Sequence, residues 1–337
     1  MKEIVITALE AGQRMDKLLG RYLKEAPKSF VYKMLRKKNI TLNGKKADGS
    51  EKLQEEDIIR IYFAEETLKK FCGEEAGEES SLMQQYPGYP LDVIYEDQNV
   101  LLVNKPAGML SQKAKPEDVS LVEYLIGYLL RKGELSAGEL SHFHPSVCNR
   151  LDRNTSGIVV AGKTMAGLQE LGKMFHDRAM CKYYRCLVKG EVRQSCYLEG
   201  YLKKDEIRNQ VSISKEKTPD SQLIRTEYVP VKTGNGLTLL EVHLITGRSH
   251  QIRAHLASIG HPIAGDTKYG DSHLNQRLRD RYGLRYQLLH SYRMELPSMD
   301  GALDNLSGKT FTAPLPDYFQ RILKGEMGED RKEKGRK

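Results

Sequence analysis

One carboxylate stands between two arginines, at the start of a stretch that favours a turn followed by a buried strand. Asp152 lies between Arg150 and Arg153. Residues 154–157 are Asn, Thr, Ser and Gly, which favour turns because their side chains bond local backbone or permit unusual backbone angles. The apolar run 158–161 indicates a strand buried on both faces. We therefore expect Asp152 on a loop held by a rigid strand, where reactive groups are often placed.

Two chemical interpretations of Asp152 follow from these neighbours. Nearby guanidinium groups favour the ionised carboxylate, which can act as a nucleophile or a base near neutral pH. Alternatively, the carboxylate and an arginine close the turn as a structural ion pair, since such pairs also occur outside active sites. The stretch by itself leaves both interpretations open.

Two further stretches carry polar groups next to predicted strands. An alternating strand over 238–244 is followed by a turn at 246–249 and then by a helix with Ile252 on its buried face, which places Arg248 near other loop residues. Residues 182–190 predict another strand, which contains Tyr184. Taken alone, a tyrosine in a strand is more often a packing residue against the neighbouring strand.

The bulk composition indicates an anionic partner in a reducing compartment. The 337 residues carry a formal charge of +8 and a pI near 9.0, which favours nucleic acid, with an acidic membrane surface as the alternative. The chain lacks an apolar run of about 18 residues, so no membrane-spanning helix is expected. The N-terminus lacks the features of a secretory signal. Five cysteines without a C-x-x-C pair argue against a disulfide framework and against a cysteine zinc site, and favour a cytoplasmic protein.

A metal site receives little support from the sequence. His142 and His144 form an H-x-H pair, but no third ligand with matching spacing follows. A metal-dependent nuclease built on Asp152 and these histidines would also need paired carboxylates for two metals, and the sequence does not supply them. We predict neither a metal nor a cofactor.

The first 63 residues form a separate basic module in our interpretation. The pattern predicts a helix over 14–24, a second helix after Pro27, a strand over 40–42, a tight turn and a strand over 58–62. Seven cations and no acid lie between positions 28 and 46: Lys28, Lys33, Arg36, Lys37, Lys38, Lys45 and Lys46. A solvated charged face would also be lysine-rich, but the lack of acids favours a surface that binds phosphate groups. Four of these residues are the candidate RNA-binding groups: Lys33, Arg36, Lys37 and Lys38.

Composition also divides the rest of the chain. Residues 64–87 are rich in Glu, Gly and Ser, which predicts a flexible acidic linker. The large domain then covers 88–324. The basic tail 325–337 is predicted to be disordered.

Several motifs resemble those of the RluA family of pseudouridine synthases. Residues 149–157 resemble the family's loop H-R-L-D-R-D-T-S-G, with Asn149 and Asn154 in place of the usual His and second Asp. The resemblance extends over about 91–320 and includes N-K-P-x-G at 104–108, K-x-Y-x-x-x-V-x-G at 182–190, T-G-R-S-H-Q-I-R at 246–253 and F-x-A-P-x-P at 311–316.

The resemblance implies a fold, a reaction and a role for each candidate residue. The fold is an α+β pseudouridine synthase fold, a large mixed and mainly antiparallel sheet flanked by helices and loops. The reaction isomerises uridine to pseudouridine in structured RNA without cofactor or metal. Asp152 is the essential carboxylate, Arg248 pairs with it, and Tyr184 stacks on the target base. Because a paired uridine is inaccessible, the nucleotide is flipped out, and Arg150 fills the vacated stack.

The N-terminal module resembles the S-four-type RNA-binding domain, a small domain with an αL-type helical motif. This combination of domains favours large-subunit ribosomal RNA as substrate, with transfer RNA second, and the protein is expected to act as a monomer. A non-catalytic RNA-binding or ribosome-assembly factor is the rival hypothesis. Such a factor explains the charge and the linker, but not Asp152, Tyr184 and Arg248 all standing in motif positions.

Overall fold

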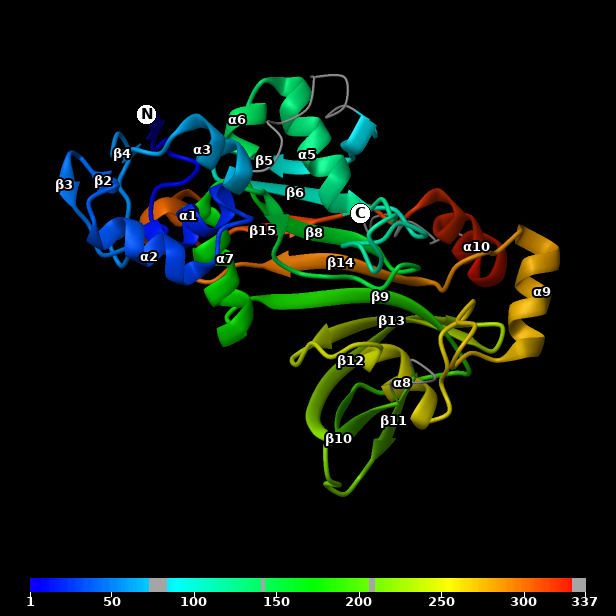
Figure 1. Ribbon diagram of the computed structural model, residues 1–337. Helices are drawn as coiled ribbons and strands as arrows, with labels where there is room; N and C mark the ends of the chain where they lie inside the picture. The colour runs from blue at the N-terminus through cyan, green and yellow to red at the C-terminus, as the bar shows by residue number, and fades with distance from the viewer. Residues whose placement is uncertain (73–83, 141–142, 206–209, 329–337) are drawn as a thin grey trace.

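The structure is a computed structural model that describes residues 1–72, 84–140, 143–205 and 210–328. Two sheets define two domains, a small N-terminal one and a large one that carries most of the chain (Figure 1). The candidate loop around Asp152 belongs to the large domain.

The N-terminal domain packs two helices against a four-stranded antiparallel sheet of order β1-β4-β2-β3. Its elements are β1 (Lys2–Val5), α1 (Met15–Tyr22), α2 (Lys28–Arg36), β2 (Ile40–Leu42), β3 (Lys45–Lys46) and β4 (Ile58–Ile61). Asn43 and Gly44 have φ values of +49° and +74° and form the two-residue turn between β2 and β3. The predicted order of helices, strands and turn is confirmed, and β1 is an additional strand.

The first part of the predicted linker is a helix. Helix α3 (Glu65–Cys72) packs Leu68 and Phe71 onto the N-terminal core, with the rings of Phe71 and Phe30 4.6 Å apart. The prediction that a flexible linker starts at residue 64 is therefore wrong, because apolar residues at helical spacing find a partner surface. Residues 73–83 lie outside the described residues. Tyr86, at the end of the predicted linker, is buried in the core of the large domain.

The large domain is built on one long mixed sheet. Its main path runs β11-β10-β12-β13-β9-β14-β8-β6-β5, with β15 paired to β14 and β7 to β8. All neighbours are antiparallel except β14 and β8. The strands are β5 (Val93–Glu96), β6 (Val100–Lys105), β7 (Ser146–Val147), β8 (Ser156–Gly162), β9 (Cys181–Lys189), β10 (Cys196–Asp205), β11 (Gln210–Ser214), β12 (Gln222–Gly234), β13 (Leu237–Leu244), β14 (Leu289–Glu295) and β15 (Thr310–Thr312). The predicted α+β fold class is confirmed.

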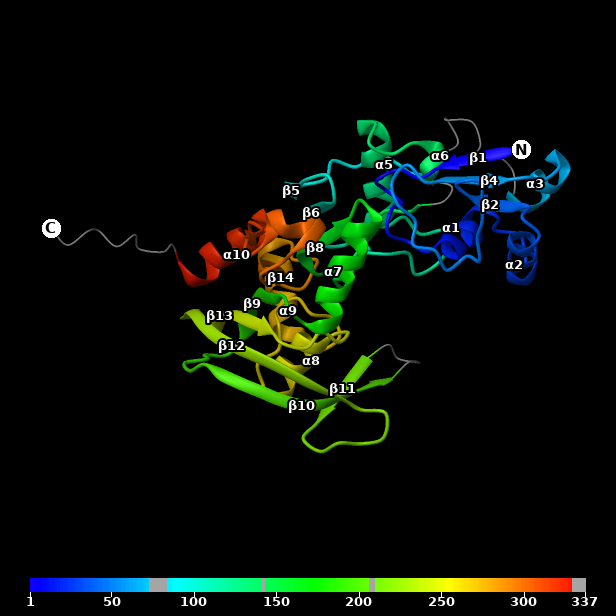
Figure 2. The ribbon, with the colours of Figure 1, turned by 90° about the vertical axis from the view of Figure 1, so that its left-hand side faces the viewer.

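Helices flank this sheet along its length. They are α5 (Leu121–Lys132), α6 (Ala137–Leu140), α7 (Met165–Asp177), α8 (Gln251–Ser258), α9 (Ser272–Tyr282), the 3₁₀ helix η1 (Gly301–Leu306) and α10 (Asp317–Met327). Helix α5 starts at Ser120 with a capping box that Glu123 completes. Figure 2 shows the β10–β11 hairpin at the end of the sheet, with α8 beside it.

The C-terminal helix corrects the predicted tail. Helix α10 continues to Met327, and the buried carboxylate of Glu326 binds Arg277 and Arg281 of α9. The prediction of disorder from residue 325 is therefore wrong for residues 325–327, because this glutamate anchors the last turn. Residues 329–337 lie outside the described residues.

Strand β8 is buried on both faces. Val159 and Ala161 enter one hydrophobic cluster, while Ile158 and Val160 enter another on the opposite face. Every residue of β8 is buried. The sequence interpretation of 158–161 as a doubly buried strand is confirmed, and this strand gives the Asp152 loop a rigid base.

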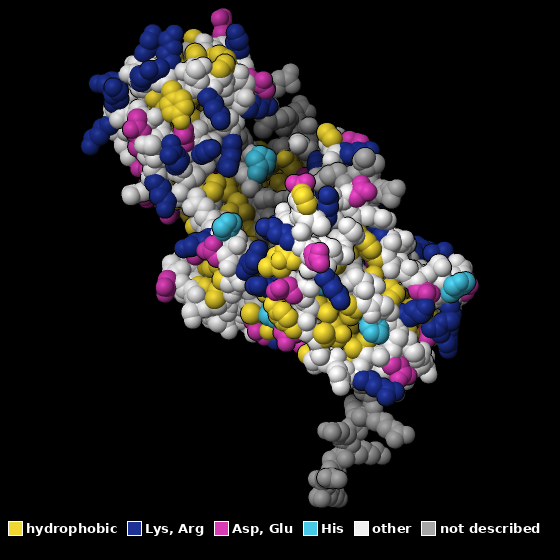
Figure 3. Space-filling model, turned by 90° about the horizontal axis from the view of Figure 1, so that it is seen from below, with side chains coloured by type: hydrophobic (Ala, Val, Ile, Leu, Met, Phe, Trp, Pro, Cys, Tyr) yellow, Lys and Arg dark blue, Asp and Glu magenta, His cyan; other side chains and the backbone are white. Residues whose placement is uncertain are grey.

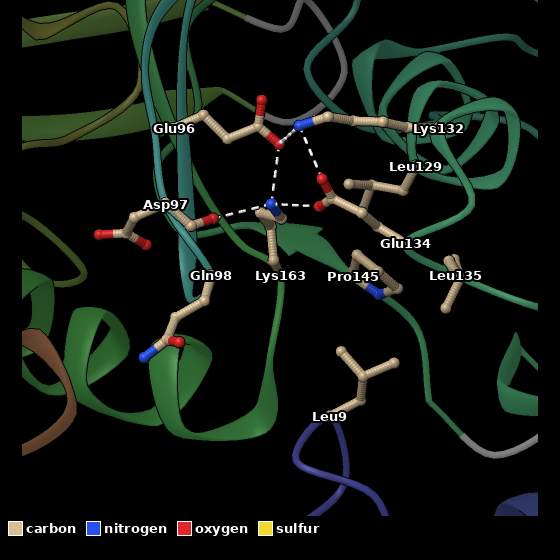
Figure 4. A pocket seen from close by; sticks show the side chains of 10 residues that line it. All are labelled: Leu9, Glu96, Asp97, Gln98, Leu129, Lys132, Glu134, Leu135, Pro145 and Lys163. Atoms are coloured by element: carbon tan, nitrogen blue, oxygen red, sulfur yellow. Dashed lines mark hydrogen bonds and ion pairs between the residues drawn. The ribbon is translucent and has the colours of Figure 1, made fainter.

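The two domains meet at the start of α7. The Met165 N–H donates to the carbonyl of Leu9 at 2.8 Å, and Gln169 donates to the carbonyl of Gly12 at 3.2 Å. A hollow of about 450 Å³ lies beside this junction (Figure 4). Its charged side chains pair with one another in a ring formed by Glu96, Lys132, Glu134 and Lys163. All four ring residues belong to the large domain, and the hollow's lining does not include Asp152.

Candidate active site

The loop that carries Asp152 connects β7 to β8 and is tied down along its length. The Thr155 N–H donates to the carbonyl of Asp152 at 3.0 Å. Gln287 donates to the Thr155 hydroxyl at 2.7 Å. The Leu151 N–H donates to the Ser111 hydroxyl at 3.1 Å, and that hydroxyl donates back to the Leu151 carbonyl. These bonds place the carboxylate group of Asp152 at the surface of a fixed loop.

Asn149 replaces the family's histidine and binds β8 directly. Its side-chain oxygen accepts the Val160 N–H at 2.8 Å, and its amide donates to the carbonyl of Ile158 at 3.3 Å. The side chain therefore bonds the start of the loop to the backbone of β8 through both its oxygen and its amide group. In this position asparagine supplies loop rigidity through backbone hydrogen bonds.

The other end of the loop requires glycine. Gly157 has a φ of +113°, and a Cβ built there would lie 2.2 Å from the carbonyl oxygen of Ser291. The parallel strands β8 and β14 therefore approach too closely for any side chain at this position. Beside it, the Ser156 hydroxyl bonds His290 Nδ1 at 2.8 Å, while His290 Nε2 bonds the Ala313 carbonyl. This contact fixes the first residue of β8.

A buried lysine lies beneath the loop. The Lys105 ammonium is fully buried and donates to the carbonyls of Met109 at 2.8 Å, Pro106 at 3.0 Å and Arg153 at 3.3 Å. Burial lowers the pKa of Lys105 to about 7, and the charge of Asp152 opposes this shift. The Gly108 N–H also donates to the Arg153 carbonyl at 2.8 Å. Lys105 thus joins the turn after β6 to the Asp152 loop.

The guanidinium that contacts Asp152 belongs to Arg253. Arg253 Nη1 donates to Asp152 Oδ2 at 2.7 Å, while Nε and Nη2 bind the two oxygens of Asp266 at 2.7 and 2.9 Å. Burial alone lowers the pKa of Arg253, but Asp266 and Asp152 outweigh it and raise the pKa above its ordinary value. Despite its own burial, Asp266 has a lowered pKa because Arg253 binds it. Arg253 is therefore a fixed positive charge between two carboxylates.

The predicted pairing of Arg248 with Asp152 is wrong. Arg248 lies in the exposed turn before α8, whereas Arg253 lies within the first turns of the helix and is 6% exposed. The helix turns Arg253 inward together with Ile252, toward the Asp152 loop. The exposed Arg248 remains available for a substrate-binding role, which stays a prediction.

Tyr184 lies close to the Asp152 carboxylate. It is in β9, opposite Val242 of β13 and Ser291 of β14, and is 6% exposed. Burial raises the pKa of Tyr184 to about 12; a hydrogen bond to Ser291 opposes the rise and the charge of Asp152 adds to it. Tyr184 is therefore a neutral phenol beside an anion at physiological pH.

The remaining candidate residues are exposed. Arg150 and Arg153 both reach solvent from the loop, and Arg153 Nε donates to the Gly108 carbonyl at 3.0 Å. The four N-terminal candidates lie on α2 and the turn after it, and all are exposed: Lys33, Arg36, Lys37 and Lys38. Figure 3 shows Lys and Arg side chains spread over this domain. These residues are accessible, and their RNA-binding roles remain predictions.

The sequence interpretation missed Lys105, Arg253 and Asp266. The sequence held a signal, since Lys105 closely follows the apolar run 100–103, Arg253 lies between Ile252 and Ala254, and Asp266 closely follows Ile263 and Ala264. A charge with apolar neighbours must find an opposite charge or several hydrogen bonds when buried. The spacing did not reveal which partner each would find, because the partners come from distant parts of the chain.

Together these groups form a site with one anionic oxygen, one neutral phenol and a rigid cationic frame. Such a site can deliver a carboxylate oxygen to an electron-poor carbon while Arg253 holds the carboxylate in place. None of the described groups of three or more His, Cys, Asp and Glu side chains has the arrangement of a metal site. Within the described residues no helix is long and apolar enough to cross a membrane.

Comparisons with known proteins show the family of this chain. Residues 99–258 match the family model for RNA pseudouridylate synthase. The chain is 32% identical to ribosomal large subunit pseudouridine synthase C of Escherichia coli O157:H7, over 96% of each chain. It is 30% identical to the protein of that name from Vibrio vulnificus, over 93% of this chain and 92% of the relative.

Solved structures show the same fold. Human RNA pseudouridylate synthase domain containing 4 superposes with a TM-score of 0.54 at 20% identity, over 72% of this chain and 93% of the other. Human RNA pseudouridylate synthase domain containing 1 gives 0.50 at 21% identity, over 72% and 99%. The motifs, the fold and the near full-length relatives together show that this chain belongs to the RluA family of RNA pseudouridine synthases.

Proposed function

We propose that this enzyme converts specific uridines of large-subunit ribosomal RNA into pseudouridine, with Asp152 as the catalytic residue. The reaction breaks the bond between the sugar and a ring nitrogen, turns the base and forms a bond from the sugar to ring carbon five. It transfers no electrons to or from the substrate and cleaves no phosphate ester. The chemistry therefore requires an anionic group near the sugar and base, but neither a redox cofactor nor a metal.

The observation that carries this proposal is the unequal use of the two Asp152 oxygens. Oδ2 accepts the bond from Arg253 at 2.7 Å, whereas no described residue donates a hydrogen bond to Oδ1. The bond from Arg253 holds the carboxylate in one orientation. Oδ1 is then the oxygen that reacts with the sugar or the base.

The neighbouring residues serve the base and the RNA strand. Tyr184 lies beside Asp152 and provides an aromatic face on which a flipped uracil stacks. Because its pKa is raised to about 12, the phenol keeps its proton and presents a neutral surface to the base. Arg150 is exposed on the Asp152 loop. Its role in this proposal is to fill the gap left in the RNA stack.

The N-terminal domain supplies affinity in this proposal. Its exposed cations contact phosphates of a neighbouring RNA helix, as in S-four-type domains, and the contact between domains holds this surface at a set distance from Asp152. Phosphate contacts position an RNA without reading its sequence. Relatives named for large-subunit ribosomal RNA favour that substrate over transfer RNA. We propose that the enzyme acts in the cytoplasm as a monomer.

Two measurements test this function. Pseudouridine mapping of cellular RNA with and without the gene should show uridines that lose modification in large-subunit ribosomal RNA. Restoring the gene should return them, while a gene encoding Asp152→Asn should not. Loss of modification confined to transfer RNA would replace the proposed substrate, and unchanged maps would overturn the proposal.

The second measurement follows the reaction directly. RNA labelled with tritium at ring carbon five releases tritium to water when pseudouridine forms, because that carbon exchanges its hydrogen for the bond to the sugar. Labelled RNA from cells lacking the gene is the substrate. Purified enzyme should release tritium in the presence of EDTA, since no step uses a divalent metal.

A further inference from the structure

A chain of hydrogen-bonding groups leads from strand β11 to the carboxylate of Asp152. The Val211 N–H donates to the Tyr269 hydroxyl at 2.8 Å. That hydroxyl lies 3.0 Å from His250 Nδ1, and His250 Nε2 faces Asp152 Oδ2 at 3.8 Å. The mechanism proposed above uses neither Tyr269 nor His250.

The order of donors along this chain follows from the groups at its two ends. Val211 has only an N–H to offer, so the Tyr269 oxygen accepts there. The hydrogen of the Tyr269 hydroxyl is then directed to His250 Nδ1, its other hydrogen-bond neighbour. A neutral imidazole that accepts at Nδ1 carries its hydrogen on Nε2. The opposite tautomer would direct a nitrogen lone pair at the Asp152 carboxylate and is disfavoured.

The surroundings keep the imidazole in this neutral form. Burial lowers the pKa of His250, and the charges of Arg253 and Lys268 lower it further. The charges of Asp152 and Asp266 raise the pKa but do not reverse the shift. The Nε2–H of His250 therefore points at the Asp152 carboxylate while the imidazole stays uncharged. Hydrogen-bond distance is near 2.9 Å, so a shift of about 1 Å is enough to complete the contact.

The backbone of His250 supports a positioning role. Its φ is +56°, a left-handed conformation that costs a non-glycine residue free energy, and it makes no side-chain cap bond to α8. The ring of Tyr269 stands at 71° to the imidazole and lies 5.3 Å from the Arg253 guanidinium. A residue with a strained backbone is thus packed against Tyr269, whose ring also contacts the Arg253 guanidinium.

We propose that Tyr269 and His250 are positioning residues that set the rotation of the Asp152 carboxylate. A single bond from Arg253 fixes the place of Oδ2 but leaves the plane of the carboxylate free to rotate about it. A second polar hydrogen directed at the same oxygen restricts that rotation and keeps Oδ1 turned toward the substrate. This inference rests on the proposed role of Asp152 and extends it to two residues that do not touch the substrate.

A double-mutant cycle, assayed on tritium-labelled RNA, tests whether Tyr269 acts on Asp152 through His250, an arrangement that we call the relay. Tyr269→Phe keeps the ring against Arg253 and removes only the hydroxyl, and His250→Ala removes the last link. Each should lower kcat about tenfold with KM unchanged, the effect of losing one hydrogen bond in the transition state. Because Tyr269 acts through His250, the double variant should be no slower than His250→Ala alone. His250→Gln, which retains an N–H donor, should recover most of the activity.

Matched controls separate positioning from a general loss of structure. Tyr95→Phe also removes a hydrogen-bonded hydroxyl, from a strand far along the sheet from β11, and should leave kcat unchanged. Thermal midpoints of all variants are measured in parallel. Multiplying losses in the double variant, a changed KM with normal kcat, or a fully active Tyr269→Phe would each overturn the relay. Tritium release by the unaltered enzyme tests the proposed function independently of these ratios.

Discussion

Two regions of this enzyme use charge in opposite ways. Beside the Asp152 loop two basic side chains are buried and fully engaged, since Arg253 binds two carboxylates and Lys105 binds three carbonyls. On α2 and the turn after it, the cations are exposed and the segment contains no acid. Removing one partner of a buried ion pair costs about 3–5 kcal/mol, whereas an exposed pair contributes about 0–1 kcal/mol. The first arrangement fixes the geometry of a reaction, and the second suits a partner that arrives with its own charges.

The largest expected effect comes from removing the charge of Asp152 alone. Asp152→Asn should lower turnover by at least about a thousandfold, because the variant has lost the reacting group. Its fold should survive, since Arg253 keeps both bonds to Asp266. RNA affinity, measured by filter binding, should match that of the unaltered enzyme. The exposed Asp300→Asn is the control, and a substantially active Asp152→Asn would refute the catalytic assignment.

The second effect distinguishes the two arginines of the T-G-R-S-H-Q-I-R motif. Arg253→Met leaves the buried Asp266 without its partner, so stability should fall by about 3 kcal/mol and turnover by about a hundredfold. Arg248→Ala removes an exposed side chain and should leave the thermal midpoint within about 1 °C. Calorimetry and tritium release measure both. Equal destabilisation by the two changes would contradict the assignment of Arg253 as the buried partner.

These two arginines also show how far the sequence alone reaches. The local patterns predicted the signature strand, its preceding loop and the positions of Asp152 and Tyr184, because those depend on short-range rules of turns and buried runs. The choice between Arg248 and Arg253 depended on whether the turn before α8 or the helix itself faces the Asp152 loop, and only the packed structure decides that. A helix start displaced by a few residues changes which side chain reaches a loop.

The prediction of a flexible linker from residue 64 was wrong for a related reason. The average composition of residues 64–87 is acidic and poor in apolar residues. The prediction relied on this average and overlooked Leu68 and Phe71, which lie in α3. Two apolar side chains one turn apart are enough to dock a short helix when Phe30 offers a partner. Whether a few apolar residues become buried depends on the surface that they meet in the folded protein. The composition of a short segment carries no information about that surface.

A third prediction is that mild acid destabilises the large domain more than the N-terminal domain. His255 and His290 are buried with pKa values lowered to about 4, whereas the N-terminal domain contains no histidine. A group whose folded-state pKa is depressed contributes stability above its unfolded value near 6.5 and loses it as pH falls toward 4. At pH 5 each histidine should cost the large domain about 2 kcal/mol.

Hydrogen exchange at pH 7.5 and pH 5.0, corrected for intrinsic rates, measures this difference between domains. Protection in β8 and β14 should fall at pH 5.0, while protection in α1 and β4 should stay constant. His290→Asn should reduce the acid sensitivity of β8, because the ionisable ring beside Ser156 is gone. Equal loss of protection in both domains would show that other groups control the response.

The smallest expected effect tests the exposed surface. Lys37→Ala with Lys38→Ala should weaken RNA binding about tenfold at low salt and leave kcat and the thermal midpoint unchanged, because neither lysine has a fixed partner to lose. The salt dependence of binding should become shallower, since fewer counterions are released. Lys69→Ala with Lys70→Ala, on α3 of the same domain, removes the same charge from another surface. If both pairs weaken binding equally, the domain attracts RNA through its net charge alone, whereas a selective loss at Lys37 and Lys38 places a phosphate contact on the turn after α2.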